Sequence, residues 1–564
     1  MMQHPWHESY PDTLKKEIDP DSYETLLNIF DEAIGKFKDK IAYVNMDASI
    51  TYGDLDRLSD EFAAYIQNKT NLKPGDKLAI QMPNLFQYPV VLFGALKAGL
   101  TVVNINPLYT PREMEHQFND SGSKGIVIIA NFAHNLEKVL HNTQIETVIV
   151  TEIGDLLGGF KGWITNFVVK NIKKMVPSYS LPRAIKFKDV LKEGAKNNFQ
   201  RPEIKSEDVA FLQYTGGTTG VSKGAVLTHR NIISNVLQTE GWLLTDAWGL
   251  ETGEGNEVVI TALPIYHIFA LTVNCISMLK VGAKNILITN PRDIPAFVKE
   301  LNKYPFTIIT AVNTLFNGLL NNEEFKNVNF KNLKISVGGG MAVQKAVATE
   351  WQEVTGCPLA EGYGLSETSP LLCCNPLDGN QKTGTIGLPV ASTEIKIFDD
   401  DGKEVEKGTP GEICAKGPQV MKGYWNRPEE TAKVFHDDWF KTGDIGLFTG
   451  GGFIKIVDRK KDMILVSGFN VYPNEVEDAV AAHPKVLEVA SIGVPHPKSN
   501  EAVKIFVVKK DESLTEEELS SFCKENLTGY KCPRYIEFRE ELPKTNVGKI
   551  LRRKLKDEEE AKRR

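Results

Sequence analysis

Two short stretches, separated by more than 300 residues, contain the residue types of a phosphate-binding site. Residues 214–224 read Tyr-Thr-Gly-Gly-Thr-Thr-Gly-Val-Ser-Lys-Gly, and residues 543–549 read Pro-Lys-Thr-Asn-Val-Gly-Lys. Glycines let backbone N–H groups come close to an anion, and hydroxyl and ammonium groups add further donors. A turn places Lys549 at the tip of a loop, where its compact charge can enter a cleft. We interpret the two stretches as halves of one ATP site that activates a carboxylate.

Familiar phosphate motifs do not explain these stretches. Lys223 and Lys549 both lack the neighbours that a lysine has in a Walker A motif. No Gly-x-Gly-x-x-Gly sequence follows a predicted strand, which removes the support for a dinucleotide site. The alternative for residues 214–224 is a polar hairpin loop. The sequence predicts a basic helix that begins at Lys549, and the alternative to a phosphate role for it is a solvated cationic face. We assign the solvated role to Arg552, Arg553 and Lys554.

Composition restricts the class of protein. The chain has 564 residues, of which 41% are hydrophobic and 25% charged, so we expect a globular protein of two or three domains. A net charge of −7 argues against a general nucleic-acid binder. The 7 cysteines contain no Cys-x-x-Cys pair, which indicates reduced thiols in a cytoplasmic protein and no disulfide framework or zinc site. We expect neither a signal peptide nor a membrane-spanning helix.

Residues 156–188 have the composition of an interfacial helix. They include no acidic residue, while basic side chains are interleaved with large apolar ones. Such segments bind anionic membrane surfaces, which would hold the protein on the inner face of a membrane. The alternative is a surface helix packed on its own domain. The predicted partners are thus small-molecule substrates and no nucleic acid, with peripheral membrane contact and a homodimer as further candidates.

Strand-like apolar runs alternate with helix-length segments through most of the chain. Examples of such strands are residues 77–81, 125–130, 147–150 and 258–263, and residues 88–98 are a helix-length segment. This alternation predicts an α/β fold with helix-covered parallel sheets. Closely spaced short strands follow at residues 394–398, 411–416 and 452–457. They predict a small β-barrel-like subdomain.

Mixed helices and strands after residue 458 predict a small, mobile α+β domain. We place the boundary so that residues 1–458 form a large AMP-binding domain and residues 459–564 form a lid that carries Lys549. A lysine on a separate lid can be brought into a site and withdrawn from it.

Three further motifs complete a family pattern. Residues 361–368 read Glu-Gly-Tyr-Gly-Leu-Ser-Glu-Thr, residues 439–444 read Trp-Phe-Lys-Thr-Gly-Asp, and residues 458–468 read Asp-Arg-Lys-Lys-Asp-Met-Ile-Leu-Val-Ser-Gly. In order and spacing, the five motifs resemble those of the adenylate-forming (ANL) acyl-CoA synthetases over roughly residues 43–555. The stretch from residue 439 to residue 468 resembles the signature of the bacterial long-chain fatty-acyl-CoA synthetases.

This resemblance implies a two-step reaction, in which a fatty acid and ATP give an acyl-AMP and pyrophosphate, and CoA then gives acyl-CoA and AMP. Lys549 would be catalytic, together with Glu367 and Thr218, which would also bind Mg²⁺. The phosphates of ATP would contact Thr215, Gly216, Gly217, Thr218, Thr219, Gly220 and Lys223. The rest of the nucleotide would contact Gly339, Glu361, Gly362, Tyr363, Ser366, Asp444 and Arg459. The acyl group would contact His267, Gly338, Gly339 and Gly340.

The resemblance also implies that the small domain rotates between the two steps. Lys461 matches the hinge position, and Gly468 lies in the segment that relatives turn toward the site for thioester formation. Alternatives are a medium-chain or aryl acyl-CoA ligase and a fatty-acyl-AMP ligase. A nucleotide-binding or fatty-acid-binding protein without catalysis is disfavoured, because mere binding does not require Lys549, Glu367 and Asp444 together.

Overall fold

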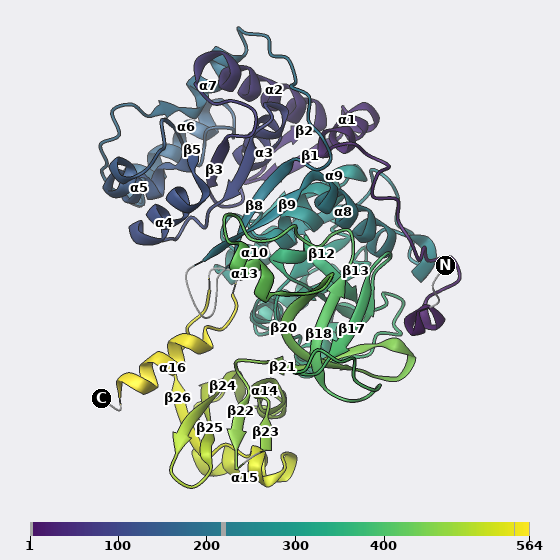
Figure 1. The fold of residues 1–564 in the computed structure, drawn as a ribbon. Coiled ribbons are helices and arrows are strands. Elements are labelled where there is room, and N and C mark those ends of the chain that lie inside the picture. The colour runs from purple at the N-terminus through teal and green to yellow at the C-terminus, as the bar shows by residue number, and fades with distance from the viewer. Residues whose placement is uncertain (1–3, 216–221, 468, 546–547, 563–564) are drawn as a thin grey trace.

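Two mainly parallel sheets and the helices that cover them form the larger part of the molecule (Figure 1). The computed structural model describes residues 4–215, 222–467, 469–545 and 548–562. Apolar residues dominate the strands of these sheets because helices cover both faces, as in β5 (Ser123–Ile129), where residues 126–129 are all buried.

The first sheet has the order β7-β6-β5-β3-β4-β8-β9 and is parallel except for the final β8–β9 hairpin. Its other strands are β3 (Lys77–Gln81), β4 (Thr101–Asn104), β6 (Thr147–Thr151), β7 (Ile185–Lys186), β8 (Val209–Thr215) and β9 (Lys223–Thr228). The hairpin therefore places Thr215 and Lys223, which belong to the predicted phosphate-binding stretch, at the edge of this sheet.

The second sheet has the order β16-β15-β14-β13-β12-β10-β11-β1-β2. Its strands are β1 (Ile41–Asn45), β2 (Ala48–Thr51), β10 (Val258–Thr261), β11 (Lys284–Leu287), β12 (Ile308–Ala311), β13 (Ile335–Gly339), β14 (Leu359–Gly364), β15 (Leu371–Cys374) and β16 (Leu388–Pro389). The central strands from β1 to β14 are parallel, and the pairs at both ends of the sheet are antiparallel.

Helices form three layers around these sheets. Between the sheets lie α1 (Leu26–Phe37), α2 (Tyr52–Lys69), α3 (Gln87–Lys97) and α8 (His229–Leu243). The outer face of the first sheet is covered by α4 (Pro111–Ser121) and α5 (Ala133–Val139). The outer face of the second sheet is covered by α10 (Ile294–Leu301), α11 (Asn313–Leu320) and α12 (Lys345–Thr355).

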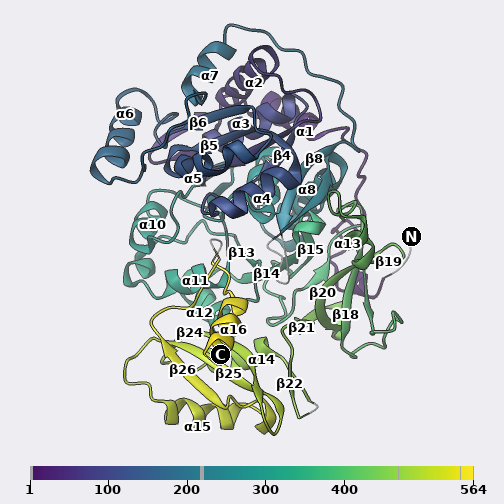
Figure 2. The ribbon, with the colours of Figure 1, turned by 60° about the vertical axis from the view of Figure 1, so that its left-hand side comes forward.

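Two smaller sheets complete the fold. The antiparallel one contains β17 (Glu394–Phe398), β18 (Gly411–Lys416), β19 (Phe435–His436), β20 (Trp439–Phe448) and β21 (Ile454–Arg459). The last contains β22 (Ile464–Val466), β23 (Phe469–Val471), β24 (Val486–His496), β25 (Asn500–Lys509) and β26 (Tyr535–Arg539). With it lie α14 (Pro473–Ala481), α15 (Glu516–Asn526) and α16 (Arg552–Ala561), at the lower end of the molecule in Figures 1 and 2.

The predicted fold class is confirmed: helix-covered parallel sheets are followed by a small β-subdomain and a small α+β region. The segment after Lys549 differs from the prediction, because α16 begins only at Arg552. Assigning Arg552 to solvent was also wrong, since its side chain is 18% exposed and pairs with Glu477. In the part of the chain that the structure describes, no helix has the length and apolar character needed to cross a bilayer.

Candidate active site

A cavity of 3140 Å³ opens where the two large sheets, the β17–β21 sheet and the C-terminal region meet. Its wall includes residues from most of the predicted motifs. These residues are Thr215, Lys223, His267, Gly339, Gly340, Glu361, Gly362, Tyr363, Ser366, Glu367, Asp444, Arg459, Lys461 and Lys549. Gly216, Gly217, Thr218, Thr219, Gly220 and Gly468 lie outside the described residues. The wall carries several cationic side chains, as a site for a polyphosphate requires.

A tyrosine connects the phosphate hairpin with the predicted metal ligand. Glu367 is buried in the 3₁₀ turn η8 (Ser366–Thr368), and the Tyr424 hydroxyl donates to its Oε1 at 2.7 Å. Lys223 starts β9, and its Nζ lies 4.7 Å above the Tyr424 ring and 2.8 Å from Glu430 Oε2. Burial raises the pKa of Glu367, because the charged carboxylate is poorly solvated there. A cation beside Glu367 would relieve that cost.

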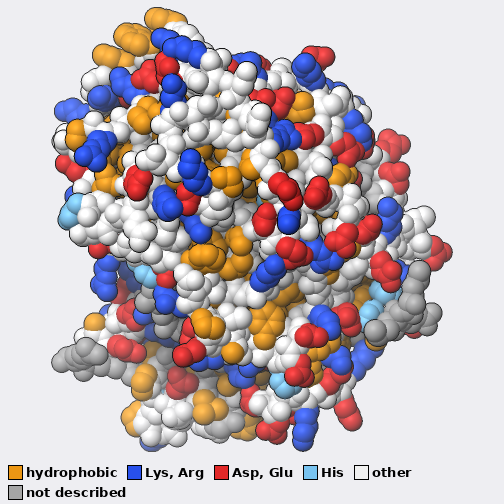
Figure 3. Space-filling view, turned by 45° about the horizontal axis from the view of Figure 1, so that its top comes forward, with side chains coloured by type: hydrophobic (Ala, Val, Ile, Leu, Met, Phe, Trp, Pro, Cys, Tyr) orange, Lys and Arg blue, Asp and Glu red, His pale blue; other side chains and the backbone are white. Residues whose placement is uncertain are grey.

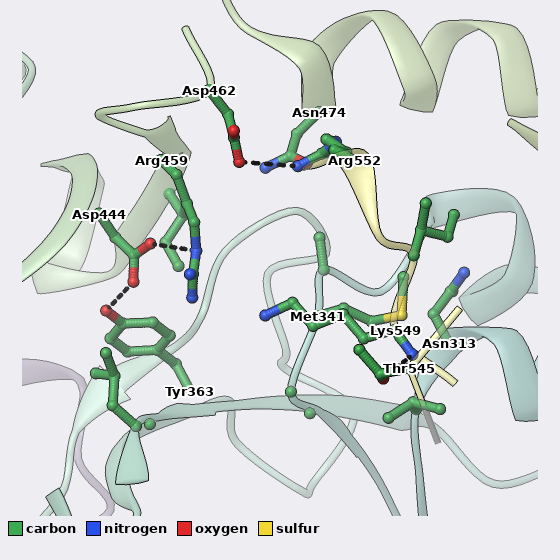
Figure 4. Close-up of a pocket in the computed structure, with 18 of the residues that line it drawn as sticks. Asn313, Met341, Tyr363, Asp444, Arg459, Asp462, Asn474, Thr545, Lys549 and Arg552 are labelled. Carbon is green, nitrogen blue, oxygen red and sulfur yellow. Dashed lines mark hydrogen bonds and ion pairs between the residues drawn. The ribbon is translucent and has the colours of Figure 1, made fainter. Parts of the chain in front are cut away.

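Tyr363, Asp444 and Arg459 form a polar group on one wall of the cavity (Figure 4). The Tyr363 hydroxyl donates to Asp444 Oδ2 at 2.6 Å, and Arg459 Nε lies 3.2 Å from Asp444 Oδ1. Asp444 in β20 and Arg459 at the end of β21 are paired across the two strands. The strand pairing thus fixes an acceptor for hydroxyl groups beside a cation.

Lys549 enters the cavity opposite this polar group, from a tight turn (Figure 4). The turn is closed by a bridge between Lys544 and Ile550, and Thr545 Oγ1 accepts from the Lys549 backbone N–H at 3.0 Å. Arg459, followed by burial, lowers the pKa of Lys549 to about 7. Burial lowers the pKa of Lys461 to about 8. An anion in the cavity would favour the protonated form of both amines.

Two hydrogen bonds from α11 hold the C-terminal region in this position. Thr314 Oγ1 donates to the Gly548 carbonyl at 2.9 Å, and Asn317 Nδ2 donates to the Leu487 carbonyl at 2.8 Å. Gly548 has φ of +83°, and a Cβ there would lie 2.7 Å from Thr314 Oγ1. Close approach and backbone conformation thus both favour glycine next to Lys549.

Arg552 joins the start of α16 to the predicted hinge. Its guanidinium makes two hydrogen bonds to Glu477, at 3.0 Å and 2.6 Å, and a third to Asn474 Oδ1 at 2.6 Å. It also lies 3.9 Å from Asp458 and 4.0 Å from Asp462. Arg552 therefore links the chain that carries Lys549 to the residues on both sides of Lys461.

The part of the cavity that is predicted to hold the acyl group includes His267 and a stretch of glycines. Burial, aided by Lys549, lowers the pKa of His267 to about 4, so its imidazole is neutral at pH 7. Gly339 and Gly340 line the wall, and a Cβ on Gly339 would lie 2.9 Å from the Phe269 ring. Gly338 lies behind this wall, where a Cβ would be 2.5 Å from Val343. Cys374 also lines the cavity, and burial raises its pKa to about 12.

Tyr424, Thr314, Asn317 and Arg552 were not identified as site residues from the sequence. Their partners lie between 57 and 234 residues away along the chain. No local spacing signal marks them, because their roles arise only from the tertiary packing.

Comparison with known proteins defines the class. The AMP-binding enzyme family matches residues 30–425, and the AMP-binding enzyme C-terminal domain matches residues 475–549. Among solved structures, the anthranilate CoA ligase AuaEII in complex with anthranoyl-AMP is 23% identical, with a TM-score of 0.85 over 97% of this chain and 100% of its own. ATP-bound MatB from Rhodopseudomonas palustris is 27% identical, with a TM-score of 0.79 over 95% of this chain and 99% of its own.

The chain belongs to the AMP-binding enzyme family. Within it, the chain is 56% identical over 561 residues to the long-chain-fatty-acid–CoA ligase of Escherichia coli O6:H1 (strain CFT073). That alignment covers 100% of this chain and 99% of the relative.

Proposed function

We propose that the protein is a long-chain fatty acid:CoA ligase that works through an acyl-AMP intermediate. The relative named above supports this substrate class at 56% identity over the full length. The observation that carries the proposal is that Lys549, Glu367 and Asp444 line one cavity, although they come from different parts of the fold. A protein that only bound a nucleotide would not need this combination.

In the first step, a carboxylate oxygen of the fatty acid attacks the α-phosphorus of ATP. The bond from the α-phosphorus to the bridging oxygen breaks, and pyrophosphate leaves. Both reactants are anions, so the protonated Lys549 would lie between carboxylate and α-phosphate and stabilise the charge of the transition state. Asp444 would accept hydrogen bonds from the ribose, with Arg459 beside it, and Tyr363 would lie against the adenine. Thr215, Lys223 and the residues between them would hold the phosphates.

Glu367 fits the requirement of Mg²⁺, which usually binds one or two carboxylates together with substrate phosphates. Its carboxylate is buried in the cavity wall, and Tyr424 orients it through one oxygen. Among the described residues no cluster of three acidic, cysteine or histidine side chains competes for a metal ion. A bound Mg²⁺ would neutralise charge on the phosphates, with Glu367 and Thr218 as the proposed protein ligands.

In the second step, the CoA thiol attacks the acyl carbon, losing its proton, and the bond to the phosphate oxygen breaks to release AMP. We place the domain boundary between residues 458 and 459, with a pivot at Lys461. Rotation would withdraw Lys549 and bring the segment containing Gly468 toward the acyl-AMP. The hydrogen bonds that Thr314 and Asn317 of α11 donate to the C-terminal region, which we call the α11 latch, support a reversible closure. Two such bonds can be exchanged for hydrogen bonds to water at small net cost.

The substrate preference rests on the acyl side of the cavity. His267 is neutral there, and Gly340 leaves room for a chain close to the backbone, whereas the Phe269 ring packs against Gly339. Because long-chain fatty acids dissolve in membranes, a cytoplasmic enzyme held peripherally at an anionic membrane is part of the proposal. A homodimer stays a prediction, which size-exclusion chromatography with light scattering tests.

ATP/pyrophosphate exchange tests the first step. Fatty acids from C4 to C18 should support exchange, with the highest rates for the long chains, while benzoate and amino acids should not. Adding CoA should then convert the acyl-AMP into acyl-CoA. Exchange that is fastest with benzoate would favour an aryl ligase, and acyl-AMP that does not react with CoA would favour an acyl-AMP ligase.

A further inference from the structure

One short helix carries its apolar side chains on the outside. In α6 (Gly159–Phe167) and the following π-helical turn η4 (Val168–Ile172), several large apolar residues are exposed, Phe160 by 74%, Trp163 by 60% and Ile172 by 65%. The described residues include eleven exposed large hydrophobic side chains, and six of them lie between Phe160 and Met175. Such a concentration in so short a segment marks an interaction surface.

The inner face of α6 is small and polar. Gly162 is buried, and a Cβ on it would lie 2.2 Å from the Gly154 carbonyl oxygen, so only glycine permits this contact. Asn166, one turn later, accepts from the Gly154 N–H at 2.7 Å and donates to Glu152 Oε2 at 3.0 Å. An ordinary surface helix packs its apolar face on the domain, and α6 does the reverse. The alternative of a helix packed through its apolar side chains is therefore excluded.

The exposed aromatic rings form a continuous ridge. Phe160 and Trp163 have ring centroids 6.1 Å apart, and Trp163 and Phe167 are 5.6 Å apart, both pairs stacked. In Figure 2, α6 projects at the edge of the molecule, away from the sheets. In Figure 3, hydrophobic side chains and lysines gather at the upper left edge, where α6 lies. Aromatic side chains in this position can insert into another surface without any rearrangement of the rest of the fold.

The charge around the ridge is positive. Lys161, Lys170, Lys173 and Lys174 are exposed, and residues 156–188 contain no acidic side chain. The nearest carboxylates before this segment are already engaged, Glu152 by Asn166 and Asp155 by Lys188 at 3.5 Å. This local positive charge contrasts with the net charge of −7 of the whole chain. It complements a negatively charged surface.

We propose that α6 and η4 dock the protein on an anionic lipid bilayer. Phe160, Trp163, Phe167 and Ile172 would enter the headgroup region, and the lysines would lie on lipid phosphates. A lipid surface has both phosphates and an apolar interior, which match the lysines and the exposed aromatic rings of this short element. This proposal names the segment that would hold the protein at the membrane. It rests on the proposed function for the idea that the fatty acid comes from the bilayer.

Co-sedimentation of the full-length protein with vesicles tests the proposal. Vesicles of phosphatidylcholine with an equal part of phosphatidylglycerol should bind the protein, and vesicles of phosphatidylcholine alone should bind it far less. The triple variant Lys170→Glu/Lys173→Glu/Lys174→Glu should lose at least about a hundredfold in binding, because each lysine near an anionic surface contributes about fivefold and each new glutamate is repelled by that surface. Phe160→Ser/Trp163→Ser/Phe167→Ser should lose binding to a similar extent, since these rings no longer enter the bilayer.

A matched control reverses three exposed lysines elsewhere: Lys326→Glu/Lys331→Glu/Lys407→Glu. It changes the net charge by the same amount and should bind vesicles within about twofold of the original protein. The proposal is overturned if both α6 variants sediment with the anionic vesicles as the original protein does, or if the control loses as much binding as they do. It is also overturned if the aromatic variant only converts a lipid-free dimer into a monomer, which would make this surface an interface between two copies.

ATP/pyrophosphate exchange with a water-soluble medium-chain acid, without vesicles, separates this proposal from the proposed function. All variants should keep the original exchange rate, because none of the altered side chains lines the cavity. If exchange is absent in every protein while sedimentation follows the expected pattern, the proposed function fails and the docking surface stands.

Discussion

The two hydrogen bonds from α11 should favour the arrangement in which Lys549 lies in the cavity. The double variant Thr314→Val/Asn317→Ala removes both α11 donors to the C-terminal region, while Arg292 still donates to the Thr545 carbonyl at 3.4 Å. A net contribution of about 1 kcal/mol for each bond gives about 2 kcal/mol, or about thirtyfold in the equilibrium between the closed and rotated arrangements. Adenylation should slow by up to that factor, whereas the reaction of supplied acyl-AMP with CoA should not slow.

Two assays measure these steps separately. ATP/pyrophosphate exchange with a long-chain fatty acid reports adenylation, and rapid-quench measurement of acyl-CoA formed from synthetic acyl-AMP reports the second step. Thr314→Ser keeps the hydroxyl donor and should retain most of the exchange rate. Asn327→Leu is the control for loss of an asparagine, because Asn327 is exposed and its side chain contacts Glu324 within its own turn.

The reasoning would be refuted by an equal loss of both half-reactions in a double variant that unfolds at the same temperature as the original protein. An unchanged exchange rate would likewise mean that the two hydrogen bonds from α11 do not determine how often Lys549 lies in the cavity.

Three further predictions concern the lysines of the site. Lys549→Ala should reduce adenylation by about a hundredfold to a thousandfold, as for loss of one transition-state donor; pyrophosphate exchange measures this, and CoA attack on supplied acyl-AMP should persist. Lys461→Pro should leave exchange largely intact and slow acyl-CoA formation, because a fixed φ restricts the pivot; comparable loss in both assays would contradict a hinge there. In the empty enzyme, the pKa of Lys549 lies below that of a free lysine, so its protonated form opposes closure below about pH 7, and the opposition fades as pH rises from 7 toward 10.5. Amine-selective labelling of Lys549 should therefore increase through about pH 7, and bound ATP should move that midpoint to higher pH; a midpoint near 10.5 without ATP would show that Arg459 does not act on it.

Local sequence signals predicted the bounds of several strands. The runs at residues 77–81 and 394–398 match β3 and β17 residue for residue. The start of α16 was missed because Lys549 and Ile550 have helix-forming side chains but belong to a tight turn closed by a backbone bridge. Helix propensity depends on the local sequence alone and does not predict the bridge between Lys544 and Ile550.

The site was predictable only as far as its motifs extend. Glu367, Asp444 and Lys549 belong to motifs, and the structure brings them to one cavity. Tyr424 and Arg552 belong to none that reveals their contacts, because each acts through partners far away along the chain. The outward apolar face of α6 was likewise undecided in the sequence, since periodicity shows that a helix has two faces but does not show which one packs.

The low reactivity of the Cys374 thiol matters because the proposed intermediate, acyl-AMP, is a mixed anhydride that thiolates attack. Its thiol lines the same cavity as the catalytic residues, within the chamber where an acyl-AMP would form. With a pKa of about 12, it stays protonated at neutral pH and is a poor nucleophile. Cys374 would therefore not compete with the thiol of coenzyme A for the acyl group.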